Sequence, residues 1–263
     1  MSKFNYKRFG ITFRWTERYS RKTLIKVLFL SLAVYLFILL INTLTISYKN
    51  ASADIQQLIL LKAIRSCGIA YFVWVIICGT WFCPNIKTKQ QRITAKMLPA
   101  TDLEKFLSHV ASLALQLIGM CIIFCIADLI RVALFAALGL DWIQWGIPVF
   151  FDNLTTYMHI LGDKSPVNYM AGIVWLLWAQ SLYALGSILF NRYSGIIISV
   201  IHVILFVALI RFIATANEMA PITKDVMIYI VLVTFTILAV FNWITGYKLY
   251  SRIQVVNNKL INL

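Results

Sequence analysis

Six long apolar runs, separated by short polar connections, make up most of the chain. They cover residues 24–46, 67–83, 106–127, 169–190, 196–213 and 226–245. A transmembrane helix needs roughly 20 mostly apolar residues, and each run approaches or exceeds that length. The run 67–83 is short, and it can be extended by including Leu58 to Ala63. The pattern predicts an all-α, polytopic membrane protein with six transmembrane helices.

The composition agrees with a membrane class. The chain is 61% hydrophobic and 13% charged, whereas a soluble domain is closer to half apolar. No polar block is long enough for a second domain. We expect a basic leader over 1–23, one transmembrane domain over 24–245 and a short tail over 246–263.

The basic residues are distributed unevenly between alternate connections. If the N-terminus is cytoplasmic, the inside connections 1–23, 84–105, 191–195 and 246–263, with Lys26 at the membrane edge, hold 17 of the 24 lysines and arginines. Such an excess is the positive-inside bias of a protein with both termini in the cytoplasm. We therefore expect a multi-pass protein of the bacterial inner (plasma) membrane.

The net charge of +14 does not indicate nucleic acid, because the cations flank the apolar runs and suit lipid headgroups instead. In the leader, aromatic residues such as Phe9 and Trp15 are interleaved with Lys7, Arg14 and Arg18. This mixture predicts an interfacial amphipathic helix on an anionic leaflet. The alternative is a disordered leader that only fixes orientation. The aromatic-rich segment 140–168 is expected to lie at the outer interface.

Motifs for catalysis are absent from the sequence. There is no phosphate-binding loop, no His-Glu-x-x-His, no Gly-x-Ser-x-Gly and no paired-carboxylate motif. The three histidines do not share a helical turn, and no histidine or carboxylate lies at zinc-finger spacing from the five cysteines. We expect no enzymatic activity, no cofactor and no metal in this chain.

The polar residues in the apolar runs or near their ends include Asp128, Arg131, Gln180 and His202. Asp128 and Arg131 are three residues apart, so they share a helix face and can form an ion pair. One interpretation is a pair at the outer interface, where water still reaches; the other is a gate or substrate contact. Gln180 either hydrogen-bonds between helices or lines a translocation route. His202 is either a satisfied polar group inside the bundle or part of a proton relay.

The connection 84–105 carries the clearest local signals. Pro99 ends the preceding structure, and Thr101 with Glu104 three residues later forms a capping-box pattern for a new helix. We expect a short cytoplasmic helix before Pro99, lying parallel to the membrane. It would present Ile93, Met97 and Leu98 to a cytosolic partner.

The segment Leu98-Pro-Ala-Thr-Asp-Leu-Glu-Lys-Phe-Leu-Ser108, flanked by basic residues, resembles the cytoplasmic loop of permease subunits of type-two ATP-binding-cassette transporters. The resemblance implies six spans with both termini inside, an amphipathic helix before the first span, and a coupling helix that docks on the ATPase. This chain departs from the pattern in one place. Its long outer segment precedes the fourth span rather than the last.

The resemblance implies a permease subunit of an ATP-driven transporter, an exporter, coupled to a separate cytoplasmic ATPase. Such permeases work as homodimers, or as heterodimers with a second permease, in contact with membrane lipids. The residues expected to form the ATPase-coupling loop are Arg92, Ile93, Lys96, Met97, Leu98, Pro99 and Glu104. The alternative is a membrane scaffold or sensor component that transports nothing. Neither hypothesis includes nucleic acid as a partner.

Overall fold

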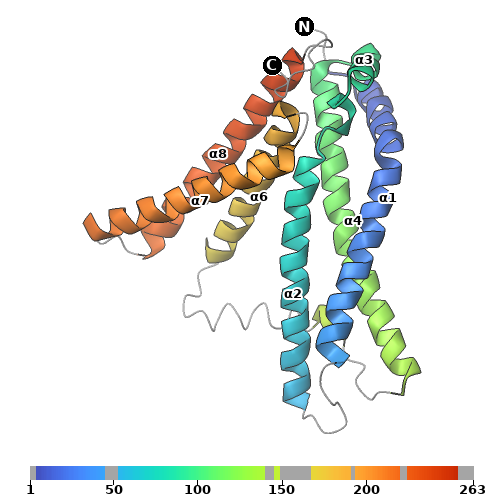
Figure 1. Cartoon of the computed structure of the whole chain (residues 1–263), viewed down its shortest axis with the longest axis vertical. Helices are drawn as coiled ribbons and strands as arrows, with labels where there is room; N and C mark the ends of the chain where they lie inside the picture. Colours follow the sequence, from blue (N-terminus) through green and yellow to red (C-terminus); the bar gives the residue numbers. More distant parts are fainter. Residues whose placement is uncertain are drawn as a thin grey trace. The chain divides into compact units, whose positions relative to one another are not determined.

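The computed structural model describes residues 4–44, 53–139, 145–148, 167–190, 193–219 and 224–253. Within these ranges the regular elements are all helical, as predicted, and no strand occurs. They are α1 (Tyr6–Leu44), α2 (Ala53–Thr80), the 3-10 helix η2 (Pro84–Ile86), α3 (Lys89–Met97), α4 (Asp102–Ala137), α6 (Val167–Leu189), α7 (Ser194–Met219) and α8 (Lys224–Arg252) (Figure 1).

Five helices in the described ranges are long and apolar enough to cross a membrane: α1, α2, α4, α6 and α8. The apolar stretch described in α7, Ser194–Leu209, is shorter. The membrane class of the chain is therefore confirmed. The sixth span and the orientation of the termini remain predictions. The outer segment expected over 140–168 falls largely outside the described residues.

Several helices run beyond the predicted apolar runs. α2 begins at Ala53, because its early turns bury an apolar cluster that includes Leu60 and Ile64. α4 continues to Ala137, past the charged residues at which the apolar run ends. It ends just before Gly139, whose φ of 64° is the left-handed conformation that commonly closes a helix.

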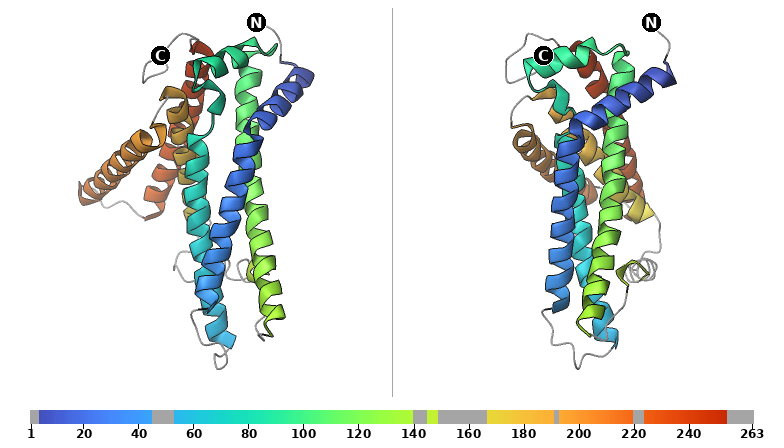
Figure 2. Two further views of the ribbon diagram at one scale, coloured as in Figure 1. Left: turned by 45° about the vertical axis from the view of Figure 1, so that its right-hand side comes forward. Right: turned by 90° about the vertical axis from the view of Figure 1, so that its right-hand side faces the viewer.

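The chain forms two compact units. One contains Met1–Tyr19, Val75–Leu113 and Pro166–Leu263, and the other contains Ser20–Trp74 and Ala114–Ser165. The boundary falls within α1, α2 and α4. We call them the loop unit and the span unit, after the 84–105 connection and the three long spans. In the span unit, α1, α2 and α4 lie side by side (Figure 2). The buried ring of Tyr35 meets Phe124 edge-on at 5.7 Å between centroids.

In the loop unit, α6 packs against both α7 and α8. Trp178, Tyr183, Ile198 and Phe235 belong to one buried cluster there. The Asn242 amide of α8 donates a hydrogen bond of 3.0 Å to the hydroxyl of Ser181 on α6. Such buried polar contacts hold membrane helices together where lipid supplies no hydrophobic drive.

Glycines allow close helix approach in the same unit. A Cβ added at Gly79 of α2 would lie 2.8 Å from the Cβ of Tyr183 and 3.1 Å from the carbonyl oxygen of Gln180. Because these are rigid atoms of α6, no side chain can move aside to make room. Gly79 therefore permits the contact between α2 and α6.

Replacing Gly79 with alanine should destabilise the protein by about 1–3 kcal/mol through overpacking. The matched control is Gly172→Ala on α6, where an added Cβ meets nothing within 4 Å. The control should be neutral or slightly stabilising, since alanine favours helix. Thermal unfolding in detergent measures both variants, and equal melting temperatures would contradict the close approach.

Candidate coupling site between α2 and α4

The short helix α3 is defined by its ends. The Thr88 hydroxyl accepts a hydrogen bond of 3.3 Å from the backbone N–H of Gln91, and the Gln91 side chain accepts one of 3.0 Å from the Thr88 N–H. This reciprocal pair is a capping box. The helix ends at Met97, because Leu98 precedes Pro99 and takes the extended conformation that a following proline favours.

α3 differs from an ordinary surface helix, because one charged residue is buried and two large apolar residues are exposed. Arg92 and Ala95 face inward and are 3% and 6% exposed. The opposite face carries the apolar residues Ile93 and Met97, which are 38% and 79% exposed. An apolar side chain held in the open on an ordered helix is typical of a binding surface rather than of a packed element.

Arg92 fastens the beginning of the connection. Its Nε donates a hydrogen bond of 2.7 Å to the carbonyl oxygen of Ile86 in η2. Burial lowers the pKa of this guanidinium from its ordinary value. Arg92 was predicted as a residue of the coupling loop, and the structure places its side chain inside, where it joins η2 to α3.

Lysines fasten the end of α3. Lys105 of α4 donates from Nζ to the carbonyl oxygen of Lys96 at 3.2 Å, so it satisfies a carbonyl in the last turn of α3. The Lys96 ammonium lies 3.5 Å from Asp102 Oδ1 and 3.5 Å from the Ser251 carbonyl oxygen near the end of α8. Figure 1 shows α3 at the same end as the first turns of α4 and the last turns of α8.

Glu104 is fully buried at the start of α4. Its Oε2 accepts a hydrogen bond of 2.9 Å from the Thr101 N–H, and its own N–H donates to the Thr101 hydroxyl at 3.2 Å. The predicted capping box is therefore confirmed. The other oxygen, Oε1, accepts from the Asn5 N–H at 2.8 Å and from Arg8 Nη2 at 3.0 Å. Glu104 thus joins the leader to α4 instead of facing a partner.

The leader continues along the connection as the first turns of α1. The hydroxyl oxygens of Thr16 and Ser108 lie 3.1 Å apart and share a hydrogen bond. Gln91 of α3 donates from Nε2 to the Tyr19 hydroxyl at 2.5 Å. The leader is helical from Tyr6, and its position at a membrane interface stays a prediction.

Behind α3 lies an aromatic cluster of Phe82, Phe106, His109, Trp243, Tyr247 and Tyr250. Phe82 follows α2, and its ring lies 5.5 Å from that of Phe106 on α4 and 5.4 Å from that of Trp243 on α8. The cluster connects three spans directly beneath the loop. Aromatic residues at helical spacing in the last run are the signal that could have indicated a shared face.

The predicted pair on α4 is formed. Arg131 donates to Asp128 Oδ1 from Nη2 at 2.7 Å and from Nε at 3.0 Å, and both side chains are buried. The Gly146 N–H donates to Asp128 Oδ2 at 2.9 Å. The pair is therefore enclosed by protein rather than held in a water-accessible position. Gly146 was not anticipated from the sequence, since nothing in the spacing of 128 and 146 indicates contact.

Gln180 and His202 belong to the loop unit, whereas Asp128 and Arg131 belong to the span unit. The His202 ring lies 5.1 Å from the Trp178 ring, between centroids. Among the described residues, His202 Nδ1 and Gln180 Nε2 have no hydrogen-bond partner. No group of three or more His, Cys, Asp or Glu residues in the described ranges could hold a metal ion.

No family model, curated protein sequence or solved structure matches this chain. Functional inference therefore rests on the residues and their contacts.

Replacing Glu104 with alanine should release the leader from α4 and cost about 1–3 kcal/mol, because three donors lose their acceptor. The matched control is Asp102→Ala, one half-turn earlier, whose partly exposed contact with Lys96 is worth about 0–1 kcal/mol. Hydrogen exchange should accelerate at residues 5–19 only for the Glu104 variant. Similar acceleration in both variants would count against the role of Glu104 in joining the leader to α4.

Neutralising one member of the buried pair should be more harmful than neutralising both. Asp128→Asn leaves a buried, uncompensated guanidinium, at a cost of about 3–5 kcal/mol. Combining Asp128→Asn with Arg131→Gln removes that charge, so the combined effect should be smaller than the sum of the single effects. The yield and melting temperature of folded protein in detergent measure the loss of stability in each variant. If the loss in the double variant equals the sum of the two single losses, the two side chains do not depend on each other.

Proposed function

We propose that this chain is the permease subunit of an ATP-driven transporter of the ATP-binding-cassette type, an exporter, and that a separate cytoplasmic ATPase docks on the outward face of α3. The observation that carries the proposal is the exposure of two large apolar residues on α3. Its arginine is buried within the protein, while Ile93 and Met97 are exposed. A protein that needed α3 only as a connector would gain stability from the opposite arrangement.

The outward face has the features of a helix that binds in a groove. Ile93 and Met97 are one turn apart, so they form a single apolar ridge. Gln90 and Thr94 lie on the same exposed face and supply a polar rim. Apolar anchors spaced by about one turn, surrounded by polar groups, are the usual recognition pattern of a helix in a partner's groove.

The contacts of α3 provide a route for mechanical coupling. Arg92 connects α3 to η2 after the second span, and Lys105 connects it to the third span. Lys96 adds a contact with the end of α8. A displacement of α3 by its partner would therefore move the ends of three spans together, as a rigid-body switch between inward- and outward-facing states requires. The sequence has no nucleotide-binding motif, so the free energy must come from the partner.

The same contacts support a six-span topology with both termini on one side. Asn5 of the leader meets Glu104 beside the loop, and Ser251 at the end of α8 meets Lys96. Groups in contact lie on the same side of a bilayer. If α4, α6 and α8 each cross the membrane, α7 must cross as well for the end of α8 to return to α3. An even number of crossings places both termini on the same side, and the positive-inside bias favours the cytoplasmic side of a bacterial inner membrane.

A subunit of this kind works as a dimer, with itself or with a second permease. The transport path lies between the two protomers, so one six-span bundle alone does not enclose it. The competing hypothesis is a membrane scaffold or sensor. It predicts the same topology but no ATPase among the bound proteins. Purification in mild detergent with identification of the bound proteins separates the two hypotheses.

Replacing Met97 with aspartate should abolish ATPase co-purification, with a loss of about tenfold or more, since a charge at the centre of a desolvated contact is costly. The matched control is Tyr6→Asp, another exposed apolar position of the loop unit, at 83% exposure. The control should retain the partner. Insertion and melting temperature should be unchanged in both, because both side chains are mostly exposed.

Full recovery of the ATPase with Met97→Asp would contradict docking on α3. Recovery of no ATPase from the unaltered protein, under conditions that keep the protein folded, would favour the scaffold hypothesis instead.

A further inference from the structure

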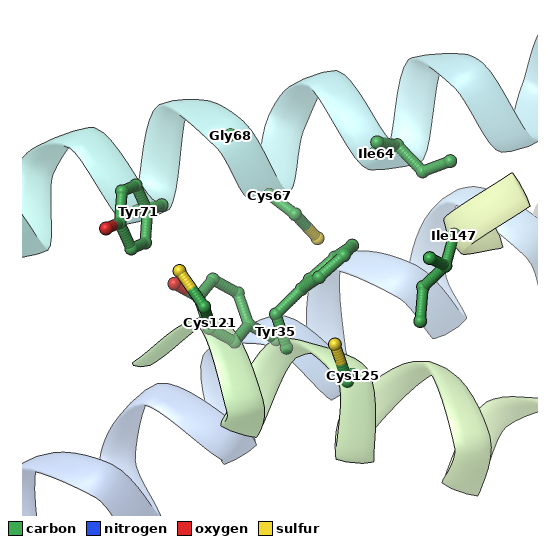
Figure 3. A pocket seen from close by; sticks show the side chains of 9 residues that line it. Tyr35, Ile64, Cys67, Gly68, Tyr71, Cys121, Cys125 and Ile147 are labelled. Atoms are coloured by element: carbon green, nitrogen blue, oxygen red, sulfur yellow. The ribbon is translucent and has the colours of Figure 1, made fainter. Parts of the chain in front are cut away.

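The span unit contains a cavity of about 300 Å³ between α1, α2 and α4 (Figure 3). Its lining includes Tyr35, Cys67, Gly68, Cys121, Phe124 and Ile147. A dry apolar cavity of about 150 Å³ already holds a benzene molecule, and small-molecule sites begin at about 300 Å³. The cavity is therefore large enough for a ligand and too large to be a packing defect.

The lining determines the chemistry of the ligand. Among the described residues that line it there is no lysine, arginine, aspartate or glutamate, and their only side-chain oxygens are the hydroxyls of Tyr35 and Tyr71. Cys67, Cys121 and Cys125 are free thiols. Such a surface gives a charged or strongly polar molecule no compensation for lost water, so it selects hydrocarbon.

The cavity has a buried floor and an exposed rim. Tyr35, Ile64 and Cys67 form the floor and are at most 4% exposed. Gly68 and Cys121 form the rim and are exposed. A Cβ added at Gly68 would meet nothing within 4 Å. The opening therefore lies between α2 and α4, on their outer surface.

The position of the opening identifies the surrounding medium. Gly68 lies halfway along the apolar helix Ile55–Thr80, which is long enough to cross a membrane. The midpoint of a membrane-spanning helix faces the ends of acyl chains and no headgroups or water. A hydrocarbon chain can enter from the side without leaving the bilayer core.

We propose that this cavity binds one hydrocarbon chain of a membrane lipid, which enters between α2 and α4 at Gly68 and Cys121. The chain belongs either to a bulk phospholipid or to a lipid-linked molecule, and its chemistry is the same in both cases. The site does not depend on the transporter proposal, because a scaffold protein with the same cavity would bind lipid equally well.

Occupancy of the cavity would act on the buried ion pair. Ile147 lines the cavity, and its neighbour Gly146 donates the hydrogen bond to Asp128. A chain packed against Ile147 would hold Gly146 against the carboxylate. The lipid therefore stabilises the contact between the segment 145–148 and α4 in addition to filling space.

The experiment uses the full chain in vesicles of phosphatidylethanolamine and phosphatidylglycerol that contain a small fraction of phosphatidylcholine with a mid-chain diazirine. Photolysis followed by peptide mass spectrometry should place adducts on the peptides that contain Gly68 and Cys121. Gly68→Leu fills the opening and should reduce these adducts by about tenfold, since displacing even two methylene groups weakens binding by that factor. Gly172→Leu, on an open face of α6, should leave them unchanged.

A second variant, Cys121→Phe, also blocks the opening and keeps the test informative if Gly68→Leu does not fold. Size-exclusion profiles verify that each variant is folded. Unchanged labelling in both folded filling variants would overturn the proposal. The absence of adducts from these peptides in the unaltered protein would also overturn it. Crosslinks between these peptides and a second copy of the chain, in place of lipid adducts, would do the same. Native mass spectrometry of the purified protein then distinguishes the source of the chain. Retained masses that match bulk phospholipids support one source, and a different lipid mass supports a lipid-linked molecule.

Discussion

The buried carboxylate of Glu104 is the constraint on which the loop unit depends. A carboxylate shielded from water requires several donors to remain ionised. Thr101 supplies one donor from the same turn. Asn5 and Arg8 supply two more from the N-terminal leader, 96 or more residues away in the sequence. Because one side chain serves all of them, the leader, the end of the loop and the start of α4 take their positions together.

The polarity of α3 follows from this arrangement. Arg92 faces inward, where its Nε reaches the Ile86 carbonyl oxygen, and Lys105 binds the carbonyl oxygen of Lys96 from the same side. Ile93 and Met97 are left on the outside. The element is thus held firmly from behind and is apolar in front, which is the combination that a docking element needs. A loosely attached helix could bind a partner, but it could not move the spans.

Local sequence patterns predicted the local structure well. The helical class, the helix break before Pro99 and the capping box of Thr101 and Glu104 all follow from neighbouring residues, and the spacing of Asp128 and Arg131 indicated their pairing. Contacts between distant segments were not accessible in this way. Neither the bond from Asn5 to Glu104 nor the one from Gly146 to Asp128 leaves a periodic signal. The burial of Arg92 was not accessible either, because a basic residue in a basic loop is normally solvated, and its contact with the carbonyl oxygen of Ile86 leaves no signal in the sequence.

Docking on α3 is the central claim, and photo-crosslinking in living cells tests it most directly. A photoreactive amino acid at position 97 lies on the outward face, and the same amino acid at position 95 lies on the buried face of the same helix. We predict that position 97 crosslinks to a soluble polypeptide that hydrolyses ATP, whereas position 95 crosslinks only within the chain. Crosslinks from position 97 to lipids alone, or to the chain itself, would contradict the account.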